Sequence, residues 1–300
     1  MCGNDVRVEG RLVRFGRLEL DKYHYLDQPE TMVEELKECG TRIDLFTFLQ
    51  RVDETTPKYK YPMEWDNLAV LPVTTFENWW TNQISSLPRN RARQAEKRGV
   101  TLREAPFGDT LVRGIWEMYN ESPIRQGAAF KHYGKSLEEV RRMSATYLES
   151  SVFIGAYMGD KLIGFVKLVA DQTWSQANLM HILSMIQYKE KAPTNALIAH
   201  SVKVCAERGI RHLVYQNFQY GNKKNDGLSN FKEVNGFKRV DVPRYYAPLT
   251  PLGAAAFRMG LHHRLVDRLP KSVVNKLLKL RRDWISRKVQ PVQEARQETR

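Results

Sequence analysis

The amino-acid sequence predicts an α/β (α+β) fold in which a mixed, mostly antiparallel sheet is flanked by helices. Two apolar runs, residues 152–157 and 161–170, are joined by Gly159-Asp160, and such turn residues between apolar runs indicate a β-hairpin. A helix over residues 193–208 begins with proline and is followed by Gly209, as helices commonly are. Because this helix connects two strand-like stretches, it predicts one parallel strand pair in the sheet.

The composition is that of an ordinary globular protein. The chain has 300 residues and a mass of 34.9 kDa, with 42% hydrophobic and 27% charged residues, which excludes collagen-like and wholly disordered chains. Its apolar runs are far shorter than the ~20 residues of a membrane-spanning helix, and no charged-then-apolar leader follows Met1. We therefore expect a cytoplasmic protein.

The spacing of cysteine and histidine predicts neither a disulfide framework nor a metal site. Cys2, Cys39 and Cys205 are scattered and form no CxxC pair. The seven histidines include no HxxxH or HExxH spacing. We expect no bound metal.

The net charge of +13 is unevenly distributed. Residues 1–70 contain 10 basic and 14 acidic residues, whereas residues 258–300 contain 12 basic and 4 acidic residues. A further basic peak lies over residues 89–98. A field of this sign attracts polyanions such as nucleic acid, anionic lipid or phosphorylated precursors. Solvated helix faces are the alternative interpretation.

The first hundred residues predict a small mixed region followed by two helices. Strands are expected over 11–20, 43–49 and 68–73, and a short helix over 31–39. Aromatic and aliphatic side chains at helical spacing predict a helix over 75–86. Pro88 is suited to the first turn of a second, very basic helix that ends at Gly99.

The following 150 residues have a more regular order of elements. Ser136 with Glu139 three residues later forms a capping box that opens one helix. Beyond the hairpin and the helix described above, we expect strands over 100–105, 178–186, 210–218 and 237–246, and helices over 109–121 and 228–235. The order is therefore β-α-α-β-β-β-α-β-α-β.

This order and three of its pieces resemble the GNAT N-acyltransferase superfamily. Residues 152–165, VFIGAYMGDKLIGF, are similar to the family's central hairpin, and the helix over 193–208 stands where the family's cofactor-binding helix follows its fourth strand. Residues 231–237, FKEVNGF, look like the closing helix with its Gly-Phe ending. The resemblance covers residues 100–250 and implies acyl transfer to an amine.

Two departures point to the Fem-type transferases within that superfamily. GNAT enzymes hold the pyrophosphate of coenzyme A with a Q/R-x-x-G-x-G/A loop, but counting from Gln187 places Glu190 and Ala192 at the glycine positions, and residues 185–197 contain no glycine. Lys232 stands where many GNAT enzymes have a tyrosine. A Phe231-Lys232 pair, and the basic helix before the second half, look instead like the Fem-type family.

The Fem-type resemblance implies two GNAT-like halves and transfer of amino acids from aminoacyl-tRNA to cell-wall precursors. We expect a reduced N-terminal half with the basic linking helix (1–98), a GNAT-like acyltransferase domain (99–252) and a basic helical extension (253–300). No tightly bound cofactor is expected. The co-substrate is acetyl-CoA or another acyl-CoA, or aminoacyl-tRNA, and the residues leave this choice open.

Four residues are candidates for catalysis. Acyl transfer needs a polarised carbonyl, a base for the attacking amine and a proton for the leaving group. His181 is a candidate base or a core histidine, and Lys232 is a candidate for neutralising a phosphate or the oxyanion or is an exposed helix lysine. Tyr215 and Tyr220 follow the strand at which the family's cleft opens.

Further candidates are assigned to substrate and cofactor binding. The polar and aromatic loop over 123–133 lies over the acceptor side of the cleft in this fold, either as a phosphate and sugar site or as a lid. The substrate-binding candidates are Arg125, Gln126, His132, Tyr133, Asn217, Arg244 and Tyr246. Cofactor-binding candidates are Gln187, Tyr188 and Asn195, although Asn195 also suits a helix cap.

Three function classes follow. The first is an acyltransferase acting on an amine of an anionic or phosphorylated acceptor, a cell-wall or polysaccharide precursor, with tRNA as a possible partner. The second is a nucleic-acid-binding protein using the basic helix over 89–98 and the basic C-terminus. The third is an inactive GNAT scaffold docked to an assembly complex or peripherally to the inner membrane face through residues 271–288, a basic amphipathic stretch with Trp284. Packing of this stretch against the protein's own body is the alternative interpretation. The last ten residues are expected to be a disordered tail.

Overall fold

The computed structural model describes residues 5–19, 25–219 and 227–263. Close contacts divide the described residues into two compact units, one formed by those within 5–107 and 147–262 and the other by residues 108–146 together with His263. None of the described helices is both long and apolar enough to cross a membrane.

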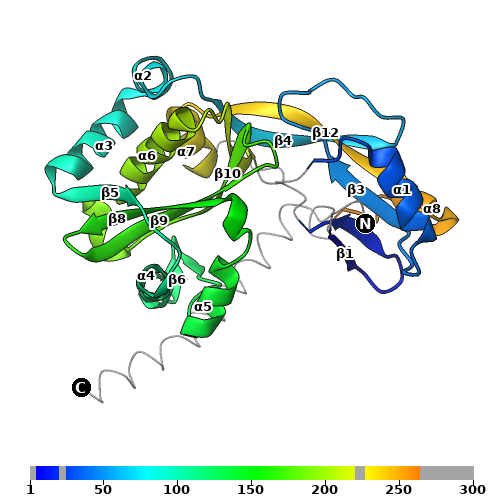
Figure 1. Ribbon diagram of the computed structural model, residues 1–300, viewed down its shortest axis with the longest axis horizontal. Helices are drawn as coiled ribbons and strands as arrows, with labels where there is room; N and C mark the ends of the chain where they lie inside the picture. Colours follow the sequence, from blue (N-terminus) through cyan, green and yellow to red (C-terminus); the bar gives the residue numbers. More distant parts are fainter. Residues whose placement is uncertain (1–4, 20–24, 220–226, 264–300) are drawn as a thin grey trace. The chain divides into compact units, whose positions relative to one another are not determined.

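The first unit is built on one sheet in the order β1-β2-β3-β12-β4-β11-β10-β9-β8-β5 (Figure 1). Its strands are β1 Val6–Glu9, β2 Phe15–Leu18, β3 Leu45–Leu49, β4 Met63–Pro72, β5 Val100–Glu104, β8 Ser151–Met158, β9 Lys161–Ala170, β10 Gln176–Ser184, β11 His212–Asn217 and β12 Lys238–Pro248. Its helical segments are α1 Pro29–Glu38, α2 Phe76–Asn78, the π-helix η1 Trp79–Gln83, α3 Ser86–Lys97, η2 Leu148–Ser150, η3 Ile186–Lys191, α6 Pro193–Glu207, α7 Gly227–Val234 and α8 Pro251–Arg258.

The strand pairing confirms the mixed, mostly antiparallel sheet. β8 and β9 form the expected hairpin. β10 and β11 are parallel, as the crossover by α6 predicts. β2 and β3 are also parallel, and every other pairing recorded in this sheet is antiparallel.

Long-range pairing makes a single sheet out of what the sequence suggests are two regions. β4, from the N-terminal region, lies between β11 and β12. β12 pairs with β4 over most of its length and with β3 near its end. The N-terminal region is therefore hydrogen-bonded directly to the strands that carry the GNAT resemblance.

Two expected elements differ from those observed. The stretch 11–20 is not one strand, because β1 and β2 form a hairpin there whose turn begins at Gly10 with φ +98°. A Cβ at Gly10 would lie 2.1 Å from the carbonyl oxygen of Val13, so the turn requires glycine. The helix expected over 75–86 is a single turn of α-helix followed by the π-helix η1.

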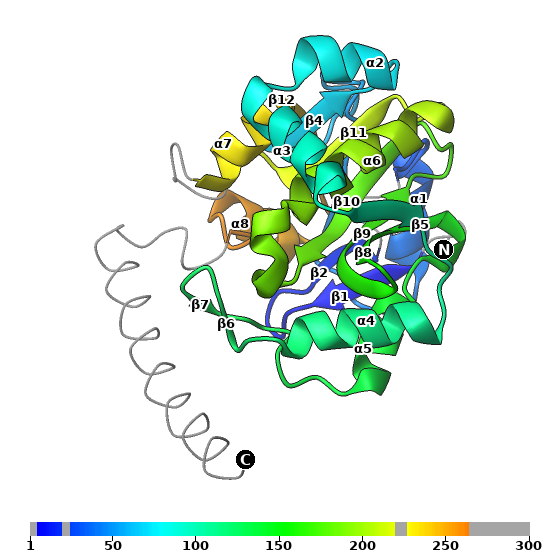
Figure 2. The same cartoon turned by 90° about the vertical axis from the view of Figure 1, so that its left-hand side faces the viewer.

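Separate hydrophobic clusters support the two ends of the sheet. At the β5 to β11 end, α3 and α6 pack against each other and α6 against β8, β9 and β10 (Figure 2). The core there includes Ile154, Val166 and Val202, all of which are fully buried. At the other end, Met32 and Leu36 of α1 pack on Phe46 and Tyr245.

The second unit is small. Its described part contains α4 Asp109–Asn120, the short hairpin β6 Ile124–Arg125 with β7 Ala128–Ala129, and α5 Leu137–Ser144. The capping box predicted at the start of α5 is present, because the Ser136 hydroxyl accepts from the Glu139 amide and the Glu139 carboxylate accepts from the Ser136 amide.

Candidate functional site

The candidate site lies where β10 and β11 separate. The two parallel strands are paired only over three positions, from Gln176 with His212 to Asn178 with Val214. β10 has a register shift against β9 between Leu179 and His181. β11 has another against β4 after Val214, where Gln216 adopts φ +49°. Bulges bend strands and are enriched beside active sites, and here one on each strand accompanies the opening.

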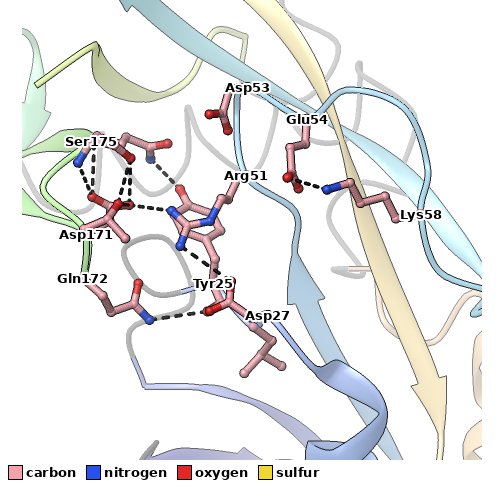
Figure 3. Close-up of polar contacts among 12 residues, drawn as sticks. Tyr25, Asp27, Arg51, Asp53, Glu54, Lys58, Asp171, Gln172 and Ser175 are labelled. Atoms are coloured by element: carbon pink, nitrogen blue, oxygen red, sulfur yellow. Dashed lines mark hydrogen bonds and ion pairs between the residues drawn. The ribbon is translucent and has the colours of Figure 1, made fainter.

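A buried polar cluster holds the closed end of these strands. Asp171 precedes β10 and is almost fully buried (Figure 3). Its carboxylate accepts from Arg51 Nη1 at 2.7 Å and from the amides of Ser175 and Gln176 at 2.9 and 3.1 Å. The Arg51 guanidinium also lies over the ring of Tyr25. The cluster therefore connects the N-terminal region to the start of β10, where the β10–β11 pairing is confined.

Lys232 is brought to the open end of the same strands by α7. Its side chain is fully buried, and Nζ donates to the backbone carbonyl oxygen of Asn217, the last residue of β11. Nζ also lies 4.8 Å from the centre of the Tyr215 ring. Tyr215 in turn packs edge-on against Phe231 and Phe237. Lys232, Tyr215 and Asn217 thus form one group, and Lys232 is not the exposed helix lysine of the alternative interpretation.

The position of Lys232 is fixed by contacts at the end of its helix. Trp79, a fully buried residue of η1, donates Nε1–H to the backbone carbonyl oxygen of Asn235 at 2.9 Å. The amide of Ser85 donates to the carbonyl of Val234. Gly236 has φ +90°, and a Cβ there would lie 3.2 Å from the backbone oxygen of Gln83. The segment before α3 therefore packs directly against the end of α7.

A cavity of about 550 Å³ lies beside this group, at the carboxyl end of β10 and the first turn of α6. Ser184, Thr194, Asn195 and Phe231 line it, together with Arg91 from α3. The hydroxyl groups of Ser184 and Thr194 are 2.9 Å apart. Asn195 lines this cavity and its side chain does not cap α6, whose N-cap is Ala192.

The loop that would hold pyrophosphate in a GNAT enzyme is folded as the 3₁₀-helix η3. The amides of Tyr188 and Ala192 donate to the carbonyls of Met185 and Lys189 within the loop. Arg98 of α3 donates to the Glu190 carbonyl oxygen. Gln187 is exposed, and Tyr188 is half-buried with the Lys161 ammonium over its ring. The backbone amides of Tyr188 and Ala192 are therefore used within the loop and do not point at a ligand. Pro193, the first residue of α6, has no amide hydrogen to donate.

His181 lies on the part of β10 that has separated from β11. It is half-buried and stacks on Phe165 with the ring centres 6.3 Å apart. Directly opposite it on β9 is Lys167, which is almost fully buried, with Nζ over the rings of Tyr147 and Phe153. Burial lowers the pKa of Lys167 to about 8.

Sequence reasoning missed Lys167 and the cavity residues Arg91, Ser184 and Thr194. Lys167 is one charged residue within the apolar strand LIGFVKLVA, which is a readable signal of a functional or strained position. The other three have no such signal, because their meeting depends on how α3 packs against α6.

The four loop candidates of the second unit are placed within that unit. Arg125 forms an ion pair with Glu121 at 2.8 Å and donates to the carbonyl of Met118, and burial lowers its pKa. His132 is buried and stacks on Tyr119 at 4.6 Å, and burial lowers its pKa to about 4. Gln126 is exposed at the hairpin turn and Tyr133 is half-buried. Their expected role in holding substrate remains a prediction.

Arg244 and Tyr246 lie in the N-terminal part of the sheet. Arg244 pairs with Asp66 at 2.7 Å, and Tyr246 packs on Phe257 and His262. Val240 of β12 is level with Asn217 through Leu68 of β4, and Arg244 and Tyr246 follow Val240 by four and six strand residues, or about 13 and 20 Å. The structure therefore does not bring them to the Lys232 group. Tyr220 and residues 271–288 lie outside the described part of the chain.

The comparisons with known proteins identify the fold. No protein-family model and no curated protein sequence matches the chain. Among solved structures, FemX matches with a TM-score of 0.57 and 9% identity over 80% of this chain and 83% of FemX.

The C-terminal domain of a predicted lysylphosphatidylglycerol synthetase from Agrobacterium fabrum matches with a TM-score of 0.56 and 14% identity over 85% of this chain and 88% of that one. The L-PGS protein from Bacillus licheniformis matches with a TM-score of 0.52 and 13% identity over 84% and 83%. Together with the mixed, mostly antiparallel sheet and the split between β10 and β11, these similarities show that the chain has a Fem-like GNAT fold.

Proposed function

We propose that this chain is an acyltransferase that moves an aminoacyl group from a charged tRNA to an amine acceptor. The observation that carries the proposal is the placement of the Lys232 amine, which is buried at the carboxyl end of β11 where β10 and β11 separate. The structures similar in fold include a protein described as a lysylphosphatidylglycerol synthetase, whose name involves an aminoacylated product. That similarity supports aminoacyl transfer as the reaction class.

The chemistry assigns a role to each part of the site. The amine nitrogen of the acceptor attacks the ester carbonyl carbon, a C–N bond forms, and the C–O bond to the donor breaks. Lys232 stabilises the negative charge that develops on oxygen, with Tyr215 and the Asn217 carbonyl holding its side chain in place. His181 accepts the proton that the attacking amine loses. The leaving 3′-oxygen takes up that proton from His181, so the step neither gains nor loses a proton overall.

The loop before α6 favours an aminoacyl ester over a coenzyme A thioester. Pyrophosphate binding at a helix N-terminus depends on backbone amides that point at the ligand. In η3 the amides of Tyr188 and Ala192 are used within the loop, and Glu190 adds a carboxylate where phosphate would approach. For the acceptor we propose an anionic or phosphorylated envelope precursor, which the net charge of +13 would attract.

Donor choice is tested by titrating the purified chain with coenzyme A and acetyl-CoA in a calorimeter, and with a non-hydrolysable aminoacyl-RNA hairpin in a filter-binding assay. The proposal predicts binding of the RNA and none of coenzyme A up to about 100 μM, a threshold of roughly −5.5 kcal/mol. Tight coenzyme A binding with no RNA binding would instead make the chain an acyl-CoA-dependent enzyme. If neither coenzyme A nor the RNA hairpin binds, the result would favour an inactive scaffold.

A further inference from the structure

A second cavity lies on the same face of the first unit, between α3, α6 and β5. Its volume is about 720 Å³, and it opens along the two helices that lie side by side in Figure 2. Its floor is made of small side chains, Ala92 of α3 with Ala196 and Ala199 of α6. Alanine at these facing positions leaves a hollow where larger side chains would fill the space between the helices.

One wall of this α3–α6 groove is an aromatic surface. Phe76 and Trp80 stack with their ring centres 5.5 Å apart and 24° between their planes, and both remain partly exposed. The Arg93 guanidinium carbon lies 5.4 Å from the centre of the Trp80 ring. Flat aromatic side chains beside arginine form the surfaces on which nucleic-acid bases stack, independently of base identity.

The rim of the groove carries mostly basic groups. Arg93 and Lys203 lie on the α3 and α6 sides, and Glu96 is the one acidic side chain of the lining. His200 lies between them, and burial together with the Lys203 charge lowers its pKa, so its imidazole is neutral at pH 7. The groove thus combines an aromatic surface for a base with cations for its phosphate.

The groove and the cavity described above are both lined by residues of α3 and α6. Asn195 lines the cavity at the start of the helix, and Ala196, Ala199 and Lys203 line the groove. From Asn195 to Lys203 the helix rises by about 12 Å. On α3, Arg91 lines the cavity and Arg93 the groove. A donor with its acyl group in the cavity and its nucleotide in the groove must therefore span this length of α6.

We propose that the α3–α6 groove binds a nucleotide of the acyl donor, with its base stacked on Trp80 and its phosphate between Arg93 and Lys203. This inference rests on the proposed acyl transfer and names where the donor is recognised. The nucleotide assigned to the groove is the 3′ end of a tRNA, and the chemically similar adenosine phosphates of coenzyme A are the alternative that the test distinguishes. Because the amides of Tyr188 and Ala192 in η3 donate within that loop, we assign the donor's nucleotide to the groove and not to the loop.

Binding is tested on the full chain with two probes, the RNA trinucleotide CCA and adenosine 3′,5′-bisphosphate, by calorimetry in a salt series. We expect Trp80→Leu to weaken binding by about 10-fold or more, since stacking on one aromatic side chain contributes on this scale. Trp80→Phe should retain most of the affinity. Arg93→Gln should weaken binding and lower the slope of log K against log salt by about 0.7.

The controls are matched in chemistry and lie outside the groove. Trp65→Leu removes an exposed indole of β4, and Arg113→Gln removes an exposed charge of α4, so both should bind the probes as the original chain does. Stronger binding of CCA identifies RNA as the source, and stronger binding of the bisphosphate identifies coenzyme A. Either result supports the groove as a nucleotide site.

The inference is overturned if neither probe binds at 1 mM, or if Trp80→Leu, shown to be folded by circular dichroism, binds as tightly as the original chain. Its failure is distinguishable from failure of the proposed function. If the groove is wrong and transfer is right, the groove variants turn over normally and Lys232→Met does not. If transfer is wrong and the groove is right, the probes bind in a Trp80-dependent way and no donor is consumed.

Discussion

Lys232 of α7 donates a hydrogen bond to the backbone carbonyl of Asn217 from a fully buried position, so the helix is tied to the last residue of β11. The two residues are fifteen apart in sequence and are joined by residues that the structure describes only in part. Burying a lysine side chain is costly unless it has partners. The carbonyl of Asn217 and the ring of Tyr215 are such partners, and they hold the amine where the strands diverge.

Replacing Arg51 by Met should destabilise the first unit by about 3 kcal/mol, because it leaves the buried Asp171 carboxylate without its cation. The double variant Arg51→Met with Asp171→Asn should recover part of that loss. Urea unfolding followed by circular dichroism measures both. Arg211→Met removes an exposed pair with Asp53 at 3.8 Å and should change stability by less than about 0.5 kcal/mol. Equal losses of unfolding free energy in Arg51→Met and Arg211→Met would show that the buried pair of Arg51 with Asp171 stabilises the protein no more than the exposed pair of Arg211 with Asp53.

Replacing Lys167 by Met should stabilise the protein at pH 7 and not at high pH. Burial lowers the folded-state pKa of Lys167 from 10.5 to about 8, so the unfolded chain binds its proton more tightly. Below pH 8 the charged, buried amine costs about 3 kcal/mol, and this cost disappears as the pH rises from 8 to 10.5. The difference in unfolding free energy between the Lys167→Met variant and the original chain should therefore shrink across that window. A difference that does not change with pH would contradict the lowered pKa.

Burial of His132 also makes the stability of the folded protein increase with pH, in this case at acidic pH. Burial lowers the pKa of His132 from 6.5 to about 4, so the folded second unit favours the neutral ring and loses stability as the pH falls from 6.5 to 4. An NMR titration of the imidazole should give an apparent pKa near 4 and ring-current shifts from the stacked Tyr119. Titration of His132 near 6.5 would show that the ring is solvated.

Local signals in the sequence predicted most elements of the GNAT-like part. The Gly159-Asp160 turn, the proline and glycine around α6, and the capping box at Ser136 each specify structure within a few residues, and each is observed. The single ten-stranded sheet could not be predicted in this way. β4 pairs with β11 and β12 across more than 140 residues, and no local pattern encodes which distant strand it joins.

The candidate site was predictable only in part for the same reason. Lys232, Tyr215 and Asn217 were found by their place in a family-like order, and they do come together. The bulges at Leu179/His181 and after Val214 leave no mark in composition or periodicity. Arg244 and Tyr246 lie on β12 beyond Val240, the residue level with Asn217, and the length of the strand carries them about 13 and 20 Å along it.

The most direct test of the account is to measure aminoacyl transfer by the original chain and by a variant in which Lys232 is replaced. A mixture of tRNAs charged with radiolabelled amino acids is incubated with the chain and an extract of envelope precursors, and labelled products are separated by chromatography. The account predicts label in a precursor fraction, lost by about 100-fold or more in Lys232→Met and retained in Lys238→Met, an exposed lysine of β12. Equal labelling by a folded Lys232→Met variant would contradict the assignment of the site. In a parallel reaction with radiolabelled acetyl-CoA in place of the charged tRNAs, label transferred from acetyl-CoA alone would contradict the assigned donor.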